Sequence, residues 1–134
     1  MNNVISMTAN GNIAPSRFVI SDTSADGKVT QAGAGGRVIG VSQQGTRRTP
    51  YSSLDDGYAA IAGEDLMVYT QGAECWLELG GTVANGDRLK SDANGKGVAT
   101  TTDRDEWGAV AMQAGASGKL IKVRVDPYGQ VSAA

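Results

Sequence analysis

The residues best suited to chemistry are acidic pairs, and their neighbours do not support catalysis or metal binding. Asp55-Asp56 and Glu64-Asp65 are of the type that serves as acid and base or as metal ligands. No nucleophile, base or glycine spacing accompanies them, which favours a solvated loop and a turn before a strand. The segment from Asp22 to Gly27 lacks the alternating Asp spacing and distal Glu of a calcium loop, so it predicts a hairpin turn.

Composition excludes several kinds of active site. The chain contains no histidine, which excludes a Ser-His-Asp triad, a Cys-His pair and histidine ligation of a metal. Its single cysteine, Cys75, excludes disulfides within the chain and cysteine-rich zinc sites. The glycine-rich stretch 33–36 precedes an expected strand instead of a helix, so it predicts a turn and not a phosphate loop. We therefore expect no catalytic residue, metal or cofactor, and we do not expect an enzyme.

Charge and hydropathy limit the possible partners. The 134 residues form about one domain, and 12 basic and 14 acidic side chains give a formal net charge of −2. Such a balance gives no general attraction to nucleic acid or to anionic membranes. No apolar run approaches the roughly 20 residues that span a bilayer, and the N-terminus lacks the features of a secretory signal. We expect synthesis in a reducing cytoplasm and neither nucleic acid nor a membrane as a partner.

Short apolar runs separated by glycine-rich turns predict the fold. Valine outnumbers leucine, and the runs follow one another at the spacing typical of all-β domains. We expect a small, compact all-β fold, a β-barrel or β-sandwich built from two related halves, with an extended N-terminal arm. The expected strands are 17–21, 37–42, 66–70, 74–79, 88–91, 97–100, 107–111 and 120–125.

An internal repeat organises the chain. Each half carries a strand, a Ser-Asp pair, a Gly-Lys hairpin, an apolar-Gly-small block and a final strand. The halves cover about 17–72 and 83–125 within a β domain at 17–125. The first half contains an insertion at about 43–61. Polar segments flank this domain, an N-terminal arm at 1–16 and a C-terminal tail at 126–134. Both are expected to become ordered against a partner.

The segment from Glu74 to Leu79 alternates polar and apolar residues, which is the pattern of a half-buried strand. If Leu77 and Leu79 face the core, Cys75 lies beside them as a buried, inert thiol. Trp76 then points outward with the neighbouring glutamates. Because aromatic residues concentrate at interfaces, Trp76 is the predicted subunit-interface residue.

The order and spacing of the repeated blocks resemble a known family. The blocks are 37–41, 63–72, 83–92, 107–111 and 120–125, and the likeness extends from about Ala14 to Val125. In this order they resemble the capsid decoration, or cement, proteins of tailed bacteriophages. The resemblance implies a homotrimer on the outer surface of an icosahedral head, made in a bacterial host. It also implies a structural role, in which the protein bridges major capsid subunits and stabilises the shell.

The predicted contact residues belong to three segments. A polar arm adds a strand to an exposed sheet edge in several known modes of peptide recognition. We expect capsid binding by such an arm, whose removal leaves the fold intact. The arm residues are Asn2, Asn3, Val4, Ile5, Ser6, Met7, Ile13 and Pro15. Loop contacts with an acidic capsid surface are expected from Arg47, Arg48 and Tyr51, and a contact between subunits from Trp76.

Two other functional classes remain open. A tail or adhesin β-domain that binds glycans or a host receptor is compatible with the expected fold. However, glycan sites usually cluster exposed aromatic residues, whereas the seven aromatic residues of this chain are scattered. A hydrolase that uses serine or carboxylate chemistry is the third class, and no constellation of residues in the sequence supports it.

Overall fold

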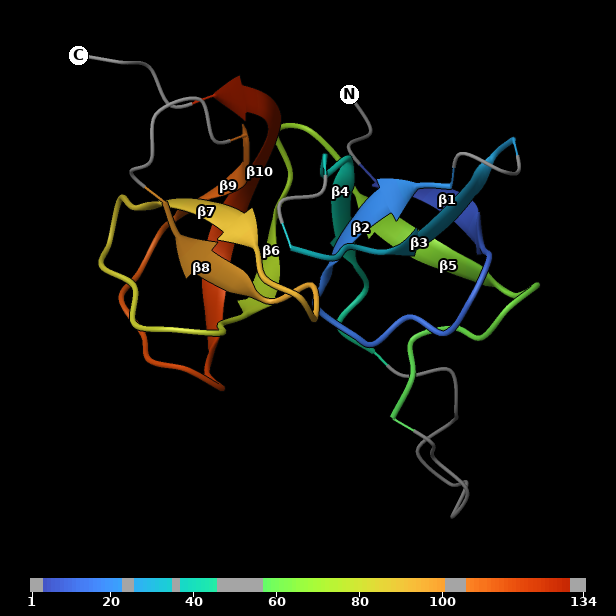
Figure 1. Ribbon diagram of the computed structural model, residues 1–134, viewed down its shortest axis with the longest axis horizontal. Coiled ribbons are helices and arrows are strands. Elements are labelled where there is room, and N and C mark those ends of the chain that lie inside the picture. Colours follow the sequence, from blue (N-terminus) through green and yellow to red (C-terminus); the bar gives the residue numbers. More distant parts are fainter. Residues whose placement is uncertain (1–3, 23–25, 35–36, 46–56, 101–105, 131–134) are drawn as a thin grey trace.

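The computed structural model describes residues 4–22, 26–34, 37–45, 57–100 and 106–130, and side chains in these ranges except at 106 and 127–130. These ranges contain ten strands and no helix, which confirms the all-β prediction (Figure 1). Accordingly, the described residues contain no helix long and apolar enough to cross a membrane. The strands are β1 (Val4–Ala9), β2 (Phe18–Ser21), β3 (Lys28–Gln31), β4 (Gly40–Ser42), β5 (Asp65–Tyr69), β6 (Glu74–Glu78), β7 (Arg88–Ser91), β8 (Gly97–Ala99), β9 (Glu106–Ala111) and β10 (Leu120–Gln130).

The first five strands form a closed barrel in the order β1-β3-β2-β4-β5. β1 runs antiparallel to β5 over five residue pairs, and its end runs parallel to β3, where Ala9 lies opposite Val29. Alternation along each strand sends every second side chain inward. The barrel interior consists of small and branched apolar residues, namely Ala9, Ile13, Val19, Val29, Ala59, Ala60, Leu66 and Val68.

The last five strands form a sheet in the order β6-β10-β9-β7-β8. Its two outer strands approach each other at one parallel bridge between Leu79 and Gly97. This bridge corresponds to the parallel contact that closes the first barrel. A side chain at Gly97 would meet Leu77, whose Cδ2 would lie 2.6 Å from the added Cβ, so glycine permits this close approach.

The two halves share one arrangement of strands. When β1 to β5 are matched with β6 to β10 in sequence order, the neighbours around each half are the same. The isolated bridge Ile13–Ala60 in the first half corresponds to Val83–Gly115 in the second. Thus the repeated blocks of the sequence reflect two similar five-stranded units.

The expected arm and tail differ from the structure. Val4–Ala9 forms β1, whose backbone pairs with β5 and whose Met7 and Ala9 contribute to the barrel interior. The prediction of an arm outside the β domain was therefore wrong for these residues. β1 is the counterpart of β6, so each half begins one strand earlier than expected. The predicted tail was also wrong in part, because β10 continues to Gln130 after a register shift between Val125 and Gly129.

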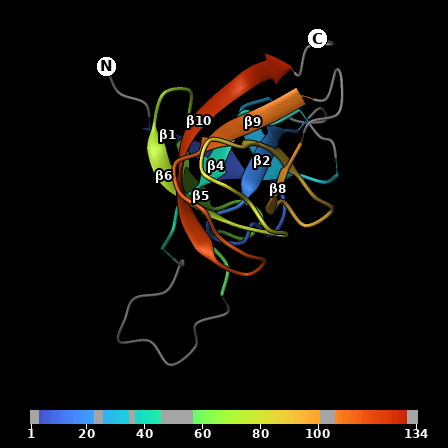
Figure 2. The ribbon, with the colours of Figure 1, turned by 90° about the vertical axis from the view of Figure 1, so that its left-hand side faces the viewer.

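A shared core joins the two halves. Phe18, Val38 and Val41 of the first half belong to the same buried cluster as the interior of the second half. Across the junction, the Phe18 N–H donates to the Gly95 carbonyl at 2.8 Å, and the Glu78 N–H donates to the Ser16 carbonyl at 3.0 Å. The halves lie side by side in Figure 1 and one behind the other in Figure 2. They consequently pack as one body.

Candidate interaction surface

The outward side chains of β6, β10 and β9 form a surface with exposed apolar residues, which we call the β10 face. Inward neighbours such as Leu77, Ile121 and Val123 are buried, so strand alternation turns the remaining residues toward solvent. Trp76, Met112 and Leu120 are 39%, 39% and 42% exposed. The face consists of Glu74, Trp76, Val110, Met112, Leu120, Lys122 and Arg124.

The strand register arranges these residues in two rows across the sheet. In one row, Lys122 lies opposite Trp76. The Lys122 carbonyl also accepts a hydrogen bond from the Met112 N–H at 2.9 Å. In the next row, Arg124 lies between Glu74 and Val110. Each row therefore places one basic residue of β10 beside an apolar residue, Met112 just after β9 or Val110 within it.

The charges on this face are incompletely paired. Glu74 Oε1 lies 3.3 Å from Lys122 Nζ, a diagonal ion pair that is about half exposed and so contributes little to stability. This contact draws Glu74 away from Arg124, the residue directly opposite. Among the described residues, the Arg124 side chain has neither an ion pair nor a hydrogen bond. The β10 face thus presents an unpaired guanidinium.

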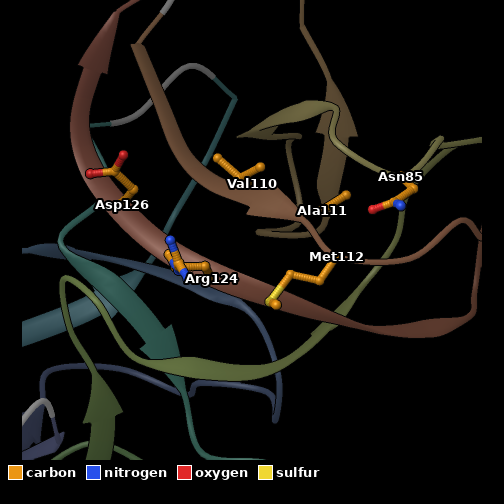
Figure 3. Close-up of a pocket in the computed structure, with 6 residues that line it drawn as sticks. All are labelled: Asn85, Val110, Ala111, Met112, Arg124 and Asp126. Atoms are coloured by element: carbon orange, nitrogen blue, oxygen red, sulfur yellow. The ribbon is translucent and has the colours of Figure 1, made fainter.

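A groove of about 340 Å³ runs along this part of the face (Figure 3). Arg124 and Asp126 project from β10, while Val110, Ala111 and Met112 come from β9 and the residue that follows it. Asn85, from the loop before β7, lies at the far end. The groove combines an apolar floor with one base, one acid and one amide.

The predicted orientation of β6 is confirmed. Cys75 and Leu77 are buried, whereas Trp76 is exposed. Burial raises the pKa of the Cys75 thiol to about 12, because the thiolate is disfavoured away from water. The thiol is therefore protonated at neutral pH and poorly nucleophilic. A role for Trp76 at a subunit interface stays a prediction.

The other predicted contact residues that the structure describes belong to the first half and not to the β10 face. Val4, Ile5, Ser6 and Met7 lie in β1 of the first barrel, and Ile13 is fully buried. Pro15 is half-buried in the segment between β1 and β2. Asn2, Asn3, Arg47, Arg48 and Tyr51 lie outside the described residues.

The acidic residues that first suggested chemistry have local structural partners. Asp65 Oδ1 accepts a hydrogen bond from Thr8 Oγ1 at 2.9 Å, which ties β5 to β1. Glu64 Oε1 accepts one from the Ile61 N–H at 3.2 Å in the preceding turn. Asp55 and Asp56 lie outside the described residues. The part of the chain that the structure describes holds no cluster of three or more possible metal ligands.

Sequence reasoning missed most of the β10 face. The alternation of residues 120–125 is enough to turn Lys122 and Arg124 away from the core, but it does not place them beside Met112 and Val110. That placement depends on the register of β10 with β9, strands joined by a long turn. The signal available in the sequence was Met112, an apolar residue directly after the predicted strand 107–111.

The corresponding face of the first barrel carries fewer charges, because Val4, Met67 and Tyr69 occupy the positions of Glu74, Lys122 and Arg124. Ser6 occupies the position of Trp76, and Asp65 with its Thr8 hydrogen bond occupies that of Leu120. Since both halves have the same strand order, the different chemistry of the β10 face arises from its side chains. The β10 face is therefore distinguished by charged residues that lie beside exposed apolar ones.

Comparison with known proteins gives a structural likeness. No protein-family model and no curated protein matches the sequence. Among solved structures, the chain is similar to the N base of the head fiber gp8.5 of bacteriophage phi29. The TM-score is 0.60, the sequence identity is 16%, and the alignment covers 92% of each chain. At this identity the comparison defines a shared fold.

Proposed function

We propose that the protein is a structural component of the head of a tailed bacteriophage. In this role it sits on the outer capsid surface, bridges neighbouring major capsid subunits and stabilises the shell. The observation that carries the proposal is the fold shared with a head fiber base over 92% of both chains, which involves both halves of the molecule. The resemblance of the sequence blocks to decoration proteins supports the same location independently.

The proposed role is mechanical and needs no catalytic residue. A protein that binds the assembled shell but not free subunits stabilises the shell by mass action. If the protein is a homotrimer, three weak contacts act together, because linked binding raises the effective concentration of each site. The exposed apolar residues of the β10 face supply contact area of the kind that interfaces contain.

Co-sedimentation with capsids tests this function. Purified protein is mixed with shells stripped of it, and the bound amount is measured as its concentration increases. We expect saturation at a fixed ratio to the major capsid protein, in multiples of three per local three-fold site. Absence of binding to any shell would contradict the proposal and favour the glycan-binding alternative, which a glycan array would then examine.

Analytical ultracentrifugation of the free protein tests the subunit interface. We expect a trimer mass for the wild type and a shift toward monomer for Trp76→Ala, because interface aromatics contribute a large share of binding energy. Met67→Ala is the matched control, since Met67 is similarly exposed, at 43%, on the first barrel. Equal masses for all three proteins would remove Trp76 from the proposed interface.

A further inference from the structure

We propose that the groove beside Arg124 binds a short, extended segment of the major capsid subunit that carries a carboxylate next to an apolar side chain. This inference rests on the proposed function, and it specifies the chemistry of the capsid segment that the protein binds. It concerns Asn85, Val110, Met112, Arg124 and Asp126, the residues with side chains on this groove. None of them was among the contacts predicted from the sequence.

The charge of the groove selects the carboxylate. Arg124 is exposed, and it lacks an ion pair or hydrogen bond to any described residue because Glu74 pairs with Lys122 instead. A guanidinium matches the planar geometry of a carboxylate with two parallel hydrogen bonds. An acidic side chain on the partner therefore completes a charge pair that the free protein leaves open.

The apolar floor selects the neighbouring side chain. In Figure 3 the Met112 side chain extends from the end of β9 back toward β10, and Val110 lies beside Arg124. Methionine adapts to differently shaped partners because its side chain is unbranched and polarisable. An apolar partner residue here covers surface that is otherwise exposed to water, which favours binding.

The size and the two ends of the groove favour a short segment. About 340 Å³ accommodates a few side chains and is too small for a folded element. The Asn85 amide at one end can donate to and accept from the backbone of a docked strand. Asp126 on β10 beyond Arg124 repels a second carboxylate, so the charge pattern also gives the segment a direction.

Charge reversal at Arg124 tests the proposal with stripped shells as the probe. We expect Arg124→Glu to weaken shell binding by about tenfold and to reduce its dependence on salt, since the complementary charge is lost. Lys119→Glu is the matched control, because it gives the same net charge and lies in the exposed turn before β10. It should bind within about twofold of the wild type. Met112→Ser, which changes no charge, should weaken binding severalfold without altering the salt dependence.

The outcomes separate this inference from the proposed function. Wild-type protein that fails to bind shells overturns both. If the wild type binds shells and Arg124→Glu binds them equally well, the proposal for the groove is overturned and the proposed capsid role is retained. An Arg124→Glu protein that loses its oligomeric mass in ultracentrifugation also overturns the inference, because the groove would then join copies of this chain. Circular dichroism of each variant establishes that it is folded before binding is measured.

Discussion

Ser16 occupies a position at which the second half of the repeat has a glycine, and its backbone adopts a conformation that is unfavourable for serine. Among the described residues it is the non-glycine residue with a positive φ, at 55°, and the corresponding Gly86 in the second half has a φ of 91°. The Ser16 side chain is buried, and its Oγ has no hydrogen-bond partner. A left-handed backbone and an unsatisfied hydroxyl are each unfavourable for serine.

We expect Ser16→Gly to stabilise the protein by about 1 kcal/mol, because it removes both unfavourable features at once. Glycine's greater freedom in the unfolded chain offsets part of the gain. Urea unfolding followed by tryptophan fluorescence measures the change. The reciprocal control, Gly86→Ala, should destabilise the protein, since it places a Cβ on a left-handed backbone. A Ser16→Gly protein less stable than the wild type would contradict this account.

At the scale of the elements, β1 is the strand that closes the first barrel. It pairs with β5 over its length and with β3 at its end, and its removal would expose unpaired edges on both partners. The structure therefore reverses one expectation drawn from the sequence, that the N-terminal segment is dispensable for folding.

Deletion of residues 1–9 is expected to lower the melting temperature strongly or to abolish cooperative unfolding, because the barrel loses a central part of its hydrogen bonding. Thermal unfolding followed by circular dichroism measures this effect. Deletion of residues 1–3 is the control, since it leaves β1 complete. A nine-residue truncation that melts like the wild type would show that the barrel does not need β1.

The sequence predicted the strands whose side chains alternate or whose ends carry turn signals. β5, β6 and the start of β10 were expected close to their observed positions, and the Leu77 side of β6 was correctly assigned to the core. β1 was missed although Ile5, Met7 and Ala9 alternate with Ser6 and Thr8, because the whole N-terminal segment was assigned to a polar arm. A clearer signal lay in the likeness of Gly11-Asn12-Ile13-Ala14 to Gly81-Thr82-Val83-Ala84, which extends the repeat to the first strand of each half. The groove depends on long-range register, which local patterns do not determine.

At the scale of the whole molecule, each half forms its own set of paired strands, but the two halves share a buried core. Apart from the junction contacts, the strands of each half pair among themselves. Phe18 and Val38, by contrast, face the second half, where Gly108 leaves room for them. An added Cβ at Gly108 would lie 2.8 Å from Val38 Cγ1. This packing couples the stabilities of the two units.

Phe18→Ala should therefore destabilise both halves together, by roughly 3–5 kcal/mol, as expected for a buried phenylalanine. Native-state hydrogen exchange monitored by NMR distinguishes joint from separate loss of protection. We expect amides in β5 and β10 to lose protection by similar amounts. Loss confined to β5 would indicate two independent units. Met67→Ala serves as the control, because this side chain is exposed and belongs to neither buried cluster.

The division into two contiguous units affects how the protein is made. Every strand partner of the first barrel lies within Val4–Tyr69, so this barrel can form during synthesis before the whole second unit has emerged from the ribosome. Until β10 emerges, that barrel exposes the apolar side that Phe18 and Val38 form, and newly made chains in one polysome can associate through it. Fast translation of the second half would shorten this exposure, and codon usage after residue 69 therefore bears on the yield of native protein.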